Sequence, residues 1–71
     1  MNTRRLTRLL REVRLEAGLT QAVLAERLGQ AQSYVSKYES GEQRLDLIEL
    51  EAICNVVGIP LRALIDRYVD S

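Results

Sequence analysis

Four glycines divide this chain of 71 residues into five short segments, and the segments have the residue spacing of α-helices. The glycines stand at positions 18, 29, 41 and 58, where glycine can adopt the left-handed conformation that often ends a helix. No segment shows the strict apolar and polar alternation of a half-buried strand. The sequence therefore predicts one small all-α domain of five helices over residues 1–71.

Capping residues mark where several of these helices begin. Thr20 is a good cap for the second helix, and Asp46 with Glu49 has the spacing of a capping box at the fourth. Pro60 suits the first position of the fifth helix. The predicted helices are 3–17, 21–28, 31–40, 47–57 and 60–69.

Apolar residues at helical spacing predict which faces are buried. The first helix offers Leu6, Leu9, Leu10, Val13 and Leu15. The fourth offers Leu47, Ile48, Leu50, Ile53, Cys54 and Val57. Segment 31–40 differs, because only Val35 and Tyr38 form an apolar side.

The composition excludes several classes of function. The chain has no histidine and one cysteine, which disfavours metal sites, disulfide frameworks and His-based catalysis. Cys54 lies on the apolar stripe of the fourth predicted helix, which predicts that its thiol is buried. No apolar run is long enough to span a bilayer, and no signal peptide pattern opens the chain. We therefore expect a cytoplasmic protein with no cofactor, no metal, no membrane partner and no evident small-molecule ligand.

Charge is balanced in total but uneven along the chain. Residues 1–44 carry eight basic and five acidic groups, a balance of +3, while residues 45–71 carry two basic and five acidic groups, a balance of −3. This uneven charge distribution is compatible with a basic face that contacts phosphates and an acidic face that lies away from them. The arginines of segment 3–17 spread around its helix, so Arg8 and Arg11 suit solvent as well as phosphate.

The polar side of segment 31–40 suits contact with DNA bases. At 100° per residue from Val35, three polar residues lie nearly opposite the core, with Ser36 beside them: Ser33, Lys37 and Ser40. Gln32 lies at the exposed N-terminal end of the same segment. Glutamine can pair with adenine, lysine reaches guanine, and serine adapts to donors or acceptors. On spacing alone, a merely solvated helix face is the alternative.

The stretch from Leu19 to Leu50, "LTQAVLAERLGQAQSYVSKYESGEQRLDLIEL", resembles the helix-turn-helix domain of the lambda-repressor-like, xenobiotic-response-element (XRE) family of bacterial and phage regulators. The resemblance extends from Leu6 to about Ile65. Its motif comprises Thr20-Gln21, Leu24-Ala25, Gly29, Gln32-Ser33, Val35-Ser36-Lys37, Glu39, Gly41 and Arg44-Leu45-Asp46. It implies a five-helix lambda-repressor-like fold, with the helix-turn-helix at about 20–40, and a transcriptional regulator that binds double-stranded DNA.

The resemblance also implies roles for individual residues. Gln32, Ser33 and Lys37 match positions that face base edges. Gln21 matches a glutamine that contacts phosphate and braces the base-reading glutamine. Two residues match contacts to the sugar-phosphate backbone: Ser40 and Arg44.

Further expectations concern the helices around this motif. Arg14 and Glu39 match a pair that joins the first helix to the third. For Tyr34 two interpretations stay open, a contact with the DNA backbone or thymine methyl and a cover over the edge of the second helix. Gln30 departs from the family, which often has an apolar residue at this turn.

The fifth predicted helix is more apolar than its place at the chain end requires, which predicts a homodimer seam. The expected seam residues are Leu61, Leu64, Ile65 and Tyr68. A symmetric homodimer would bind an inverted repeat. The alternative is an interaction module such as an antitoxin, whereas a conventional catalytic constellation, and so an enzyme, is not expected.

Overall fold

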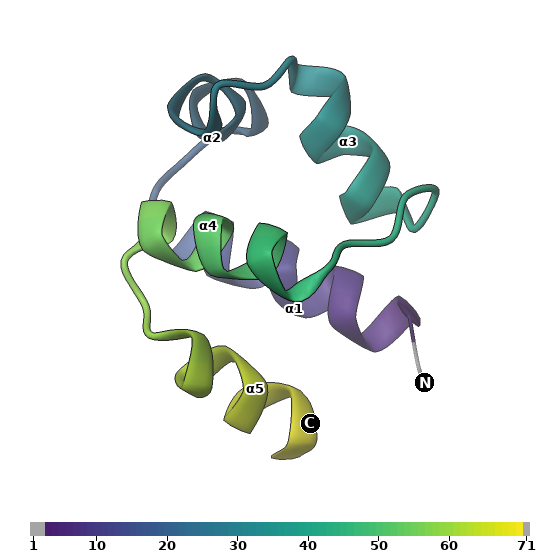
Figure 1. Cartoon of the computed structure of the whole chain (residues 1–71), viewed down its shortest axis with the longest axis vertical. Helices are drawn as coiled ribbons and strands as arrows, with labels where there is room; N and C mark the ends of the chain where they lie inside the picture. The colour runs from purple at the N-terminus through teal and green to yellow at the C-terminus, as the bar shows by residue number, and fades with distance from the viewer. Residues whose placement is uncertain (1–2, 71) are drawn as a thin grey trace.

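The computed structural model describes residues 3–70, and over that range it contains five α-helices and no strand. The helices are α1 (Thr3–Glu16), α2 (Gln21–Leu28), α3 (Gln32–Ser40), α4 (Leu47–Val57) and α5 (Leu61–Asp70). In Figure 1, α4 crosses the middle of the view in front of α1, with α2 and α3 above them and α5 below. The predicted all-α, five-helix fold is confirmed. None of the described helices is long and apolar enough to cross a membrane.

Local capping explains why the helices begin where they do. Thr20 Oγ1 accepts the Val23 N–H at 3.1 Å at the start of α2. Asp46 and Glu49 form the predicted capping box, in which each side chain accepts the other residue's backbone N–H, at 2.7 and 2.8 Å. Each such cap satisfies N–H groups that have no partner within the helix.

Four predicted helix ends differ from the structure by one residue each. Ala17, Ala31 and Pro60 lie outside the helices, and α5 ends at Asp70, one residue later than predicted. Ala31 has extended backbone angles and is the N-cap of α3. The Pro60 carbonyl accepts the N–H groups of Ala63 and Leu64, so Pro60 precedes the first full helical residue of α5.

The core lies where the five helices meet. Its buried residues are Leu9, Leu10, Val13, Leu24, Ala25, Val35, Tyr38, Ile53, Cys54 and Leu64. The prediction that Leu15, Leu47 and Ile48 belong to the buried stripes is wrong, because their exposed fractions are 54%, 61% and 77%. Ile48 stands two residues before Leu50, and that spacing directs the two side chains to nearly opposite sides of α4.

Two surface contacts attach α5 to α1. Arg67 donates hydrogen bonds of 2.8 and 2.9 Å to the two carboxylate oxygens of Glu16. This pairing lowers the pKa of the Glu16 carboxyl below its usual value. The Arg5 guanidinium lies over the Tyr68 ring, 4.3 Å from its centroid. Because the side chains of Arg67 and Glu16 are largely exposed, we expect this ion pair to contribute only modestly to stability.

Candidate nucleic-acid interface

A tight turn joins α2 to α3. Gly29 has a φ of 70°, a left-handed value that non-glycine residues rarely adopt, and its N–H donates to the Glu26 carbonyl at 3.0 Å. The next N–H, of Gln30, donates to the Ala25 carbonyl at 2.9 Å. Figure 1 shows α2 almost end-on while α3 runs across the view, so the two helices cross steeply. Ala25, which is buried, is the small side chain on α2 that permits this approach.

Arg14 and Glu39 form a buried ion pair between α1 and α3. Arg14 Nε donates to Glu39 Oε2 at 2.7 Å, and Nη2 donates to Oε1 at 3.1 Å. A third donor of Arg14, Nη1, binds the Leu19 carbonyl at 2.9 Å. The two side chains are only 8% and 4% exposed, and the hydrogen bond to Glu39 raises the pKa of Arg14. The pair therefore fixes the end of α3 against α1 with its charges compensated.

Gln21, at the first position of α2, joins the same network. Its Nε2 donates to Glu39 Oε1 at 3.1 Å. The resemblance implies that Gln21 braces Gln32, but the partner that the structure gives this amide is Glu39, at the far end of α3. Gln21 thus connects the start of α2 to the ion pair of Arg14 and Glu39.

The outer face of α3 is exposed along its whole length. Its members are Gln32, Ser33, Ser36, Lys37 and Ser40, all of them exposed. The Ser40 hydroxyl donates to the Lys37 carbonyl at 3.0 Å within the last turn. The core side of the helix is formed by Val35 and Tyr38, as the spacing predicts.

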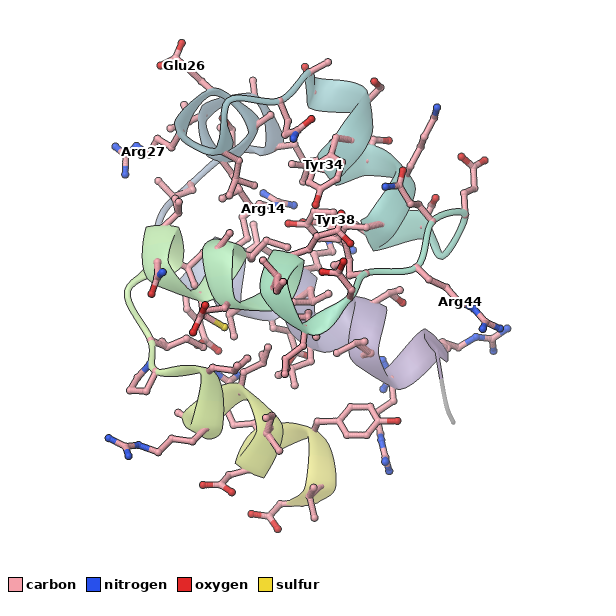
Figure 2. All side chains as sticks on the ribbon, viewed as in Figure 1. Arg14, Glu26, Arg27, Tyr34, Tyr38 and Arg44 are labelled. Carbon is pink, nitrogen blue, oxygen red and sulfur yellow. The ribbon has the colours of Figure 1, made fainter. Side chains whose placement is uncertain are left out.

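Tyr34 lies on the side of α3 that faces α4. Its hydroxyl donates to Glu49 Oε2 at 3.1 Å, and its ring meets the Tyr38 ring edge-on, with the centroids 5.6 Å apart. Figure 2 shows both rings between the two helices. Burial and the adjacent Glu49 carboxylate raise the pKa of Tyr34 to about 12. This contact gives Tyr34 a structural role between α3 and α4, which neither the expected DNA contact nor the expected cover over α2 described.

Two recesses flank α3. Arg44, exposed on the loop after α3, lines one of them together with Thr7 and Gln43, and Figure 2 shows its side chain extending away from the body of the protein. The other is an open polar depression between α1, α2 and α3. The residues that line the depression are Arg11, Arg14, Gln21, Ser36, Glu39 and Ser40. Sequence spacing could not predict what surrounds Arg11, because this depression arises only from the packing of three helices.

Comparisons with known proteins agree with this geometry. A family model described as helix-turn-helix matches residues 10–64, which is more than half of the chain. A solved "XRE-family like protein" from Pseudomonas syringae pv. tomato str. DC3000 is 44% identical, with a TM-score of 0.88 over 96% of this chain and 83% of that one. The chain belongs to the XRE family of helix-turn-helix regulators. A comparison with curated proteins gives no match.

Two other solved structures show how widely this XRE fold occurs. The clp gene regulator ClgR from Corynebacterium glutamicum is 24% identical, with a TM-score of 0.86 over 96% of this chain and 72% of that one, which shows a shared fold. Hydroxypropylphosphonic acid epoxidase from S. wedmorenis is 32% identical, with a TM-score of 0.77 over 87% of this chain. The match covers only 33% of that enzyme, so the similarity concerns a minor part of it.

The apolar surface of this XRE-family chain differs from the predicted dimer seam. Leu64 is 1% exposed and belongs to the core of its own chain, so it is not available as a seam residue. Leu61 also packs against the core, while Ile65 and Val69 are 45% and 67% exposed. A shallow apolar pocket lies between α1, α4 and α5. Its walls are Leu6, Leu50, Leu64, Ile65 and Tyr68.

Proposed function

We propose that this XRE-family regulator binds an inverted-repeat DNA operator as a homodimer and reads bases with the outer face of α3. The observation that carries this proposal is the exposed polar face of α3 on a helix that is held from behind at two points. Those points are the Arg14–Glu39 ion pair and the hydrogen bond from Tyr34 to Glu49. A rigid support of this kind keeps polar side chains in a defined position for recognition.

Base reading is assigned to the side chains that project from this face. Gln32, in the first turn of α3, has the amide that can pair with adenine in the major groove. Lys37 can reach guanine O6 and N7, and its exposed position on α3 leaves the ammonium group accessible. The hydroxyl of Ser33 and that of Ser36 can each donate a hydrogen bond to a base or accept one from it.

Phosphate contacts are assigned to groups at the edge of the same face. Gln21 begins α2, where backbone N–H groups without a helical partner attract anions. The Gln21 amide that binds Glu39 still has a second N–H and a carbonyl oxygen available for the sugar-phosphate backbone. Ser40 and Arg44, both exposed, follow at the end of α3 and in the next loop. Such contacts position a protein on DNA without reading its sequence.

The dimer follows from the information that an operator must contain. One recognition helix reads only a few base pairs, so two helices about 34 Å apart are needed to specify a site in a genome. We assign the seam to the exposed Ile65 and Val69, together with Tyr68 at the apolar pocket. In a twofold arrangement, each of these side chains meets the same surface of the other subunit.

Selection from a pool of random DNA duplexes tests the proposal. We expect the enriched sequences to share two inverted half-sites, separated centre to centre by one helical turn of DNA, about 10 base pairs. Enrichment of a single site without inverted symmetry would contradict the dimer while leaving base reading by α3 intact. Binding without any enrichment would contradict sequence-specific regulation altogether.

A further inference from the structure

The polar depression between α1, α2 and α3 directly adjoins the recognition face. Ser36 and Ser40 belong to both, because they lie one turn apart on the outer face of α3 and also line the depression. Gln21 forms the side that belongs to α2, and Arg11 forms the side that belongs to α1. A molecule that follows the recognition face of α3 past Ser36 therefore meets the depression next.

The charge of the depression is positive. Arg14 and Glu39 compensate each other, since both carboxylate oxygens of Glu39 accept hydrogen bonds from the guanidinium. Arg11 then adds one positive charge, and its side chain is exposed. Glu12, the acidic neighbour of Arg11 in the sequence, lies 3.8 Å from Arg67 of α5. The depression as a whole thus favours an anion.

The donors around the depression suit a phosphate group. Arginine binds phosphate oxygens with two parallel N–H groups. The hydroxyl of Ser36 and the second N–H of the Gln21 amide supply neutral donors of the kind that commonly contact DNA phosphates, whereas the Ser40 hydroxyl donates its proton to the Lys37 carbonyl. The start of α2 adds backbone N–H groups on the same side as Gln21.

We propose that Arg11 binds a backbone phosphate of the DNA in this depression, beside the bases that α3 reads. This assignment rests on the proposed function, because the phosphate belongs to the same duplex. Arg11 and Arg44 line separate recesses, one between three helices and one at the loop after α3. The protein therefore holds the duplex through two independent cations, one from each recess.

The salt dependence of binding to a random-sequence duplex of about 20 base pairs tests this assignment without knowledge of the operator. We expect Arg11→Gln to reduce the slope of log affinity against log salt by about 0.9 per subunit. Between 50 and 200 mM salt, the variant then loses roughly 3.5-fold less affinity per subunit than the parent does. Arg11→Lys retains the charge, and its slope should equal that of the parent.

Matched variants separate this effect from a general change of charge. Arg62→Gln removes the same charge from an exposed position on α5, and we expect it to leave the slope unchanged. Arg44→Gln should reduce the slope independently, and the double variant of Arg11 and Arg44 should show the sum of both reductions. Because Arg11 is exposed, the thermal melting of Arg11→Gln should match that of the parent.

These measurements distinguish failure of the Arg11 assignment from failure of the proposed function. A parental slope in Arg11→Gln would overturn the role of Arg11 and leave the proposed function standing. An equal reduction in Arg62→Gln would also overturn it, because the effect would then come from net charge. A parent protein that does not bind duplex DNA at any salt concentration would overturn both the proposed function and the assignment of Arg11.

Discussion

The hydroxyl of Tyr34 on α3 donates a 3.1 Å hydrogen bond to Oε2 of Glu49 on α4. The other oxygen of the same carboxylate accepts the N–H of Asp46 at the start of α4. The Glu49 side chain thus caps α4 and also holds α3 against it. The loop that carries Arg44 runs between α3 and the capped start of α4.

The burial of Tyr34 and its hydrogen bond to Glu49 raise the pKa of its hydroxyl, and this shift can be measured. The pKa of Tyr34 is raised to about 12, above the value near 10 of an unfolded chain, so the folded protein retains this proton more tightly. Its contribution to stability is therefore complete below about pH 10 and is lost as the pH rises from about 10 to about 12. An absorbance titration of the parent and of Tyr34→Phe should differ by one phenol with a midpoint near pH 12. A difference centred near pH 10 would contradict the hydrogen bond.

Base reading by α3 predicts losses that depend on sequence. Replacing Gln32 or Lys37 with alanine should cost about 1–3 kcal/mol of binding free energy on the best selected site. The loss should concentrate at one or two base pairs, as measured with single-base variants of that site. Asn55→Ala, an exposed change on α4, is the control and should bind every site as the parent does. If both α3 variants keep the parental preference at every base pair, another surface reads the DNA.

The buried pair of Arg14 and Glu39 predicts a strong coupling in folding stability. Removing one partner of such a pair typically costs about 3–5 kcal/mol, because the other charge remains buried. A loss of this size approaches the whole stability of a small domain, so variants that retain side-chain volume are preferable. We expect Glu39→Gln and Arg14→Met to be coupled by more than about 1 kcal/mol in a double-mutant cycle of urea unfolding. Additive losses would show that the contact contributes nothing.

The revised dimer seam predicts a change in assembly. Ile65→Asp places a charge at the edge of the apolar pocket, and because Ile65 is 45% exposed the fold should survive, which circular dichroism can check. We expect the parent to sediment as a dimer, the variant as a monomer, and operator affinity to fall sharply. Ile48→Asp makes the same change on the opposite side of α4 from Leu50. If Ile48→Asp dissociates the dimer and Ile65→Asp does not, the dimer seam lies on α4 and not on α5.

Features determined by a few neighbouring residues were accessible from the sequence. The glycines, the Thr20 cap and the capping box of Asp46 and Glu49 act within one helical turn, and they located the helix ends to within one residue. The outer face of α3 was equally predictable, because Val35 and Tyr38 alone define its buried side. These interactions depend on spacing along the chain and not on how the helices are arranged.

Other features depend on how separate helices pack, and only the tertiary structure decided them. Spacing along α5 placed Leu64 and Ile65 together in the seam, but the angle at which α5 meets α1 and α4 buries the first and exposes the second. Tyr34 and Glu49 lie 15 residues apart, and Gln21 and Glu39 lie 18 apart, so no local pattern identifies them as partners. Arg11 likewise lines the depression beside the outer face of α3 only because α1, α2 and α3 converge. In a domain of this size, a small rotation of one helix changes which of its side chains are buried and which are exposed. Hydrophobic periodicity therefore predicts the helices, whereas the packing of the helices determines which residues a partner can reach.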